Sequence, residues 1–144
     1  VELDVIEQLL DAGVVIIAVG GGGIPVVTND AGDLEGIAAV IDKDLASALL
    51  ASRIGADMLL ISTAVEQVAL NFGKENEEWV SQFTRAEVKQ YLAEGGHFAE
   101  GSMAPKMRAV VQYMEAGGKE ALITNPQNLE PAMLGKTGTR IVHG

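Results

Sequence analysis

The sequence has no cysteine and only half as many basic as acidic side chains. Without cysteine the chain can form no disulfide framework, cysteine nucleophile or thiolate-ligated metal site, and it fits a reducing cytoplasm, the location we expect. The 10 basic and 20 acidic residues give a formal net charge of -10. This balance argues against sequence-independent nucleic-acid binding and against docking on an anionic membrane, so we expect neither partner.

Long hydrophobic runs are also lacking. The longest purely apolar stretch, Val14 to Val19, ends at Gly20, whereas a membrane span needs about 20 such residues. Its composition is typical of a strand that is covered on both faces. The length of 144 residues favours a single domain over 1–144. Because the chain begins at Val1 within an amphipathic helical pattern, we expect a further segment upstream.

Hydrophobic periodicity predicts an α/β fold. Apolar residues at helical spacing predict helices in the ranges 3–12, 45–54, 85–94 and 102–116, and a short helix from 125. Apolar runs predict strands at 14–19, 37–41, 57–62, 68–72, 121–124 and 139–142, while 29–36 and 73–78 are predicted loops. The strand, helix and strand over 37–62 predict a βαβ unit with a parallel crossover. Thr84 and Glu87 have the spacing of a helix capping box.

Four consecutive glycines, Gly20, Gly21, Gly22 and Gly23, follow the first predicted strand. Without a Cβ, each can bring its N–H close to an anion, so the loop is a candidate cradle for a phosphate or carboxylate. A tight, crowded chain reversal is the alternative. The loop is neither a Walker A motif nor a convincing dinucleotide fingerprint, because no Lys-Ser/Thr pair and no helical pattern follow it.

The tripeptide Asp42-Lys43-Asp44 lies where a predicted strand gives way to a helix. Ligands of open parallel sheets bind beyond the carboxyl ends of the strands, so this position is suited to a site. A lysine between two carboxylates can be held towards a phosphate. Alternatively, Asp44 serves only as a helix cap.

A third candidate is the segment from Gly101 to Lys106, which opens a predicted helix. Free N–H groups and the positive end of the helix dipole favour an anion there. Lys106 lies in the first turn, where a cation is unfavourable unless an anion offsets it; a lysine that points into solvent is the alternative. His97 and His143 have no partners at metal-ligand spacing, and we expect them in surface or loop positions.

Together these segments resemble the carbamate kinases, which belong to the amino-acid kinase family. The resemblance is carried by residues 18–26, 40–50 and 97–106 and continues in order to Gly138-Thr139-Arg140-Ile141. It implies a three-layer αβα sandwich with a mostly parallel central sheet. It also implies reversible phosphoryl transfer between carbamoyl phosphate and ADP, giving ATP and carbamate, in a homodimeric enzyme. Mg²⁺ would be held mainly by the phosphates of ADP or ATP, with no direct protein ligand.

The same resemblance implies roles for individual residues. Lys106 would stabilise the transferring phosphoryl group, Asp44 would orient the catalytic lysines, and Lys43 would contact phosphate or carbamoyl oxygens. The loop from Gly20 to Gly23 would lie against the phosphoryl or carbamate site. The nucleotide would be bordered by Ser62, Thr63, Ala64, Val65, Val68, Met103 and Lys106.

The sequence also departs from the family pattern. Glu66 stands where many relatives have aspartate, and Glu100 stands where proline is usual. Relatives are roughly twice this length, so the resemblance covers a C-terminal, nucleotide-binding half and the last strand of the other half. Two alternatives stay open: a nucleotide-binding module without turnover, and another amino-acid kinase that acts on a carboxylate or phosphate acceptor.

Overall fold

A four-stranded sheet forms the centre of the protein, whose computed structural model describes residues 2–144. Its strand order is β3 (Met58–Ser62), β7 (Glu120–Thr124), β8 (Thr139–Val142) and β6 (Gln82–Thr84). β3 pairs with β7, and β6 with β8, in parallel, whereas β7 and β8 are antiparallel. The sheet is therefore mostly parallel, as predicted.

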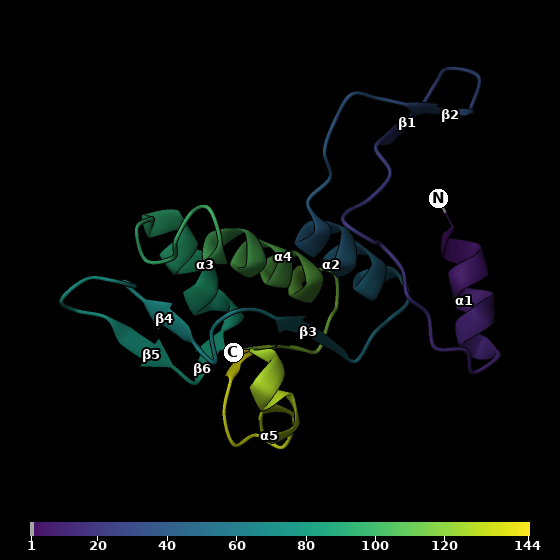
Figure 1. Ribbon diagram of the computed structural model, residues 1–144. Coiled ribbons are helices and arrows are strands. Elements are labelled where there is room, and N and C mark those ends of the chain that lie inside the picture. The colour runs from purple at the N-terminus through teal and green to yellow at the C-terminus, as the bar shows by residue number, and fades with distance from the viewer. Residues whose placement is uncertain (1) are drawn as a thin grey trace.

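Helices cover both faces of this sheet. α2 (Lys43–Arg53), α3 (Arg85–Glu94) and α4 (Met103–Glu115) lie on one side. The 3₁₀ helix η1 (Pro126–Asn128) leads into α5 (Leu129–Met133) on the other side (Figure 1). This arrangement confirms the predicted three-layer αβα sandwich. No helix within residues 2–144 is both long and apolar enough to cross a membrane.

The hydrophobic core lies between the sheet and the layer of α2, α3 and α4. Met107, Val110 and Tyr113 on α4 are fully buried against Ile123 of β7 and other strand residues. The Tyr113 hydroxyl donates a hydrogen bond of 2.5 Å to a backbone carbonyl, and burial raises the pKa of this phenol. Packing of α4 against the sheet fixes the direction from which its first turn approaches the carboxyl ends of β3 and β7.

Two hairpins and one helix lie outside this sandwich. β4 (Val68–Leu70) pairs with β5 (Glu78–Val80), and β1 (Val26–Thr28) pairs with β2 (Leu34–Gly36), both antiparallel. The loop predicted at 29–36 therefore contains β2. α1 (Leu3–Asp11) has no buried residue, and Figure 1 shows α1 and the β1–β2 hairpin extending away from the sandwich.

Two predicted strands are wrong. Residues 14–19 join no sheet within residues 2–144, Val19 has a φ of +69°, and Val15 and Ile17 are 93% and 100% exposed. Residues 37–41 also form no strand, so the predicted βαβ unit over 37–62 is not made. An apolar run has the composition of a strand, but a strand also requires a neighbour to satisfy its backbone groups. The parallel crossover instead joins β3 to β7 through α3 and α4.

The predicted capping box at the start of α3 is confirmed. Thr84 Oγ1 accepts from the Glu87 N–H, and Glu87 Oε2 accepts from the Thr84 N–H at 2.7 Å. These hydrogen bonds from Thr84, the backbone one first, hold the pKa of Glu87 below its usual value.

Because the folded-state pKa of Glu87 is lowered, its stabilising contribution is present above the unfolded-state pKa and is lost as the pH falls through the folded value. We expect Thr84→Ala to lower Tm by about 4 °C at pH 7. Scanning calorimetry from pH 7 to pH 3 should show this difference shrinking in acid. A difference that stays constant down to pH 3 would contradict a role for the carboxylate.

Candidate functional site

The N-terminus of α2 is capped by Asp42. Its Oδ1 accepts hydrogen bonds from the N–H groups of Asp44 at 2.8 Å and Leu45 at 3.1 Å. A cap at this position is the expected role of an aspartate that precedes a helix. Asp42, and not Asp44, therefore caps the helix, so the alternative in which Asp44 is only a cap is wrong. The Asp44 carboxylate is available for another partner.

That partner is Lys106, in the first turn of the neighbouring helix α4. Its Nζ lies 2.8 Å from Asp44 Oδ2, and the two side chains are only 14% and 11% exposed. The anion that offsets a lysine at a helix N-terminus is therefore a carboxylate of this chain. Lys43 Nζ lies 4.0 Å from the same oxygen and its side chain is 58% exposed. Two ammonium groups therefore share the Asp44 carboxylate.

A cavity of about 190 Å³ opens beside this cluster. Lys43, Asp44 and Ser47 line it from α2, Gly20 lines it from the glycine loop, and Ser62 lines it from the end of β3. The cavity therefore lies at the carboxyl end of a parallel strand, where ligands of such sheets bind. The sequence interpretation missed Ser47. Its spacing of four residues from Lys43, which places both on one helix face, could have identified it.

The glycine loop packs against the start of α2. A Cβ built on Gly22 would lie 2.1 Å from the carbonyl oxygen of Ile41, so only glycine allows this approach. The N–H groups of Gly20 and Gly22 donate to Ala18 and Val19 within the turn. Within this loop, the N–H groups of Gly21 and Gly23 have no hydrogen-bond partner among residues 2–144. The loop is therefore a tight reversal at Gly20 and Gly22 and a possible anion cradle at Gly21 and Gly23.

The segment before α4 does not form the predicted amide cradle. The N–H groups of Ser102, Met103 and Ala104 all donate to the carbonyl oxygen of Ala99, at 3.0 to 3.1 Å. The prediction of free N–H groups at this helix start is therefore wrong for residues 102–104. The segment contributes the Lys106 ammonium to the cluster instead.

The residues predicted to border a nucleotide divide into two groups. Ser62 ends β3 and lines the small cavity, and Thr63, Ala64 and Val65 form the loop that follows it. Met103 is half-buried at the start of α4. Val68, in contrast, is fully buried in the core, so its side chain offers no surface to a nucleotide.

Side-chain hydrogen bonds connect the loop after β3 to the segment before β8. The hydroxyl of Thr137 donates to the Glu66 carboxylate, and Gln67 Nε2 donates to the Gly138 carbonyl at 3.2 Å. Thr124, which pairs with Ser62 across the two parallel strands, has a buried hydroxyl without a hydrogen-bond partner in the described chain. The hydrogen bonds of Glu66 and Gln67 were not predicted, because they join residues about 70 positions apart in the sequence.

The described part of the chain holds no group of three or more His, Cys, Asp or Glu side chains that could bind a metal ion. His97 contacts Glu94 at 3.0 Å, and His143 contacts a backbone carbonyl at 2.7 Å. Asp44 is already engaged by Lys106.

Comparison of the sequence and the structure with known proteins shows which family this chain belongs to. Residues 1–125 match the Amino acid kinase family. The chain belongs to that family. The carbamate kinase-like protein YahI of Escherichia coli is 49% identical over 142 residues, covering 99% of this chain and 45% of that protein. The carbamate kinase of Thermococcus kodakarensis is 45% identical over 142 residues, covering 99% of this chain and 44% of that protein.

Solved structures support the same assignment within the amino acid kinase family. Carbamate kinase from Giardia lamblia bound to AMP-PNP superposes with a TM-score of 0.91 at 40% identity, over 100% of this chain and 50% of that one. The αβα fold of this chain therefore matches the fold of the corresponding half of the Giardia enzyme. The chain spans about half the length of the curated relatives it matches.

Proposed function

We propose that this chain takes part in reversible phosphoryl transfer between carbamoyl phosphate and ADP, giving ATP and carbamate. The observation that carries the proposal is the Lys106–Asp44 ion pair of 2.8 Å beside Lys43, at the rim of a polar cavity. Relatives that share 43–50% of its residues are named carbamate kinases, which supports the same reaction here.

In this reaction an oxygen of the ADP β-phosphate attacks phosphorus, and the bond from phosphorus to the carbamoyl oxygen breaks. Carbamate leaves with the bonding electron pair. The transferring group is negatively charged, so catalysis depends on positioning and charge neutralisation. Lys106, held by Asp44, would neutralise charge on the transferring group, and Lys43 would contact its oxygens. When bound, Mg²⁺ would add further neutralisation at the phosphates.

The nucleotide would occupy the ends of β3 and α4. The Giardia carbamate kinase structure contains AMP-PNP, which supports nucleotide binding by this chain. Thr63 N donates to the Thr124 carbonyl at 2.8 Å, so the loop after β3 starts from a fixed position. Residues 62–65 and Met103 would border the nucleotide.

A second candidate is nucleotide binding without turnover. It is favoured by the fact that the chain spans about half the length of its curated relatives, so a complete substrate site could need further residues.

Two measurements on the purified chain separate these candidates. Calorimetry with ADP, in the presence and absence of Mg²⁺, tests binding, and a luciferase-coupled assay tests ATP formation from Mg-ADP and carbamoyl phosphate. Binding with ATP formation supports the proposed reaction, and binding alone supports the second candidate. Phosphorylation of a carboxylate acceptor by ATP, without use of carbamoyl phosphate, would indicate another acceptor. Absence of ADP binding contradicts both candidates.

A further inference from the structure

Hydrogen bonds join residues 66–68 to residues 137–139. Each residue of the first segment contacts the residue 71 positions further along the chain, so the two segments run in parallel. The three pairs are Glu66 with Thr137, Gln67 with Gly138, and Val68 with Thr139. We call this set of contacts the seam. Because a side chain takes part in every pair, single substitutions can remove these contacts one at a time.

The inner end of the seam lies in the core. Thr139 is fully buried, and its Oγ1 accepts a hydrogen bond of 2.8 Å from the Val68 N–H. The same hydroxyl donates to the Val80 carbonyl at 2.5 Å. One buried hydroxyl therefore satisfies a backbone group on β4 and another on β5, as a buried polar group requires. This end connects the β4–β5 hairpin to β8 of the central sheet.

The outer end of the seam lies beside the loop of residues 63–65. There the exposed Glu66 carboxylate accepts from the Thr137 hydroxyl. At the other end of the loop, the Thr63 N–H donates to the Thr124 carbonyl at 2.8 Å. No hydrogen bond within residues 2–144 fixes the backbone of residues 64 and 65 between these two points. The conformation of the loop therefore depends on what holds its ends.

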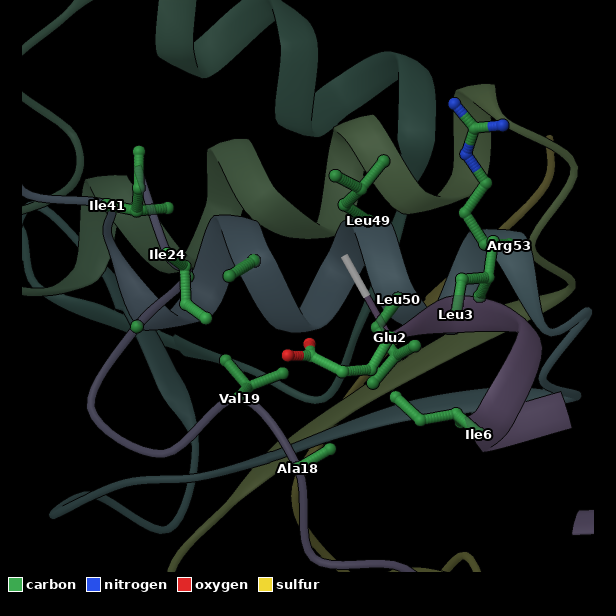
Figure 2. A pocket seen from close by; sticks show the side chains of 13 residues that line it. Glu2, Leu3, Ile6, Ala18, Val19, Ile24, Ile41, Leu49, Leu50 and Arg53 are labelled. Atoms are coloured by element: carbon green, nitrogen blue, oxygen red, sulfur yellow. The ribbon is translucent and has the colours of Figure 1, made fainter. Parts of the chain in front are cut away.

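This loop adjoins the polar cavity of the candidate site. Ser62, directly before the loop, lines that cavity together with Lys43 and Asp44. Another cavity, of about 590 Å³, lies elsewhere: Figure 2 shows Leu3 of α1 and Leu49 of α2 among its walls, and no member of the seam lines it. Of these two cavities, only the polar one adjoins the loop that the seam holds.

A binding loop that is already held in its bound conformation loses little conformational entropy when the ligand arrives. If the loop is released, the apparent affinity falls by the factor by which the binding-competent fraction falls. The inner end of the seam is needed for the fold, whereas the outer hydrogen bond joins an exposed carboxylate to a half-buried hydroxyl and buries no apolar group. Its effect should therefore fall on the loop more than on global stability.

We propose that Glu66 and Thr137 are positioning residues for nucleotide binding, because their hydrogen bond holds residues 63–65 in place before the nucleotide arrives. This role rests on the proposed function, which supplies the nucleotide, and adds how the chain prepares a loop to receive it. Neither residue needs to touch the nucleotide. Both act through the loop that would border it.

The test is Thr137→Val, which removes the hydroxyl and keeps the size of the side chain. We expect calorimetry to show a dissociation constant for ADP about tenfold higher, because a hydrogen bond to a charged group is lost and the competent fraction falls. Without nucleotide, NMR order parameters of residues 64–66 should fall from about 0.85 to below about 0.6. In the assay of ATP formation, KM for ADP should rise while kcat stays constant.

Two further variants make the result specific. Thr137→Ser keeps the hydroxyl, so it should restore ADP binding to within about twofold of the unmodified chain. Thr28→Val makes the same replacement at an exposed position on β1 and should leave affinity and order parameters unchanged. Circular dichroism verifies the fold of each variant. If Thr137→Val does not fold, Glu66→Ala removes the same hydrogen bond from an exposed position.

Three results would overturn this role. The first is unchanged ADP affinity in Thr137→Val, including the case in which Tm falls, since a merely structural contact would lower Tm alone. The second is unchanged order parameters at residues 64–66. The third is an equal loss of affinity in Thr137→Ser, which would assign the effect to packing of the methyl group. Absence of ADP binding by the unmodified chain is a separate result: it contradicts the proposed function, and the positioning role falls with it.

Discussion

Lys106→Ala is expected to lower the rate of ATP formation from Mg-ADP and carbamoyl phosphate by at least about 10³-fold, the range seen when a cation that neutralises a transferring phosphoryl group is removed. The Lys106 ammonium lies 2.8 Å from Asp44 in a poorly exposed position, so solvent cannot replace it easily. The measurement is single-turnover ATP formation by the purified chain. Calorimetry of ADP binding separates loss of catalysis from loss of affinity.

Two controls make this result specific. Lys89→Ala removes an exposed ion pair with Glu115 on α3 and α4 and should leave the rate within twofold. Lys106→Met keeps the aliphatic stem but removes the charge, so it should lose activity to the same degree as Lys106→Ala. Full activity in Lys106→Met would contradict the assigned role, because packing of the stem would then be the only contribution of this residue.

The sequence predicted the sandwich well because its core elements have local signals. The helical spacing of Met107, Val110 and Met114 predicts α4, and Thr84 with Glu87 marks the start of α3. The layer arrangement itself came from the resemblance. The open segment 14–19 was predicted as a strand for the same local reason and is wrong, since pairing depends on partners that no local pattern encodes.

The candidate site was predicted in part. The Asp42-Lys43-Asp44 tripeptide and Lys106 were singled out, and the structure brings Asp44 and Lys106 together across 62 positions of sequence. Which aspartate caps α2 could not be decided from spacing, because both positions are compatible with a helix start. Satisfaction of the amides of residues 102–104 by one carbonyl was also not predictable, since it depends on the turn that the chain makes before α4.

Gly22→Ala is expected to lower the same rate by about 10²-fold, because misplacement of a site element by about 1 Å can have an effect of that size. The added Cβ would lie 2.1 Å from the Ile41 carbonyl oxygen, which is backbone and cannot rotate away. The loop must therefore move off the N-terminus of α2, and Gly20 would leave the wall of the cavity that Lys43 and Asp44 line. Steady-state kinetics should show the loss, and amide exchange at residues 20–23 should accelerate.

Gly21→Ala is the matched control for this prediction. A Cβ at Gly21 meets no atom within 4 Å, and the backbone there is not in the left-handed region. The two variants make the same chemical change one residue apart, so a difference between them reports the contact with Ile41 rather than loss of glycine flexibility. Equal activity of both variants would contradict a role for the loop at the site. Equal loss in both would instead mean that the flexibility of the whole loop, rather than the contact with Ile41, is what the reaction requires.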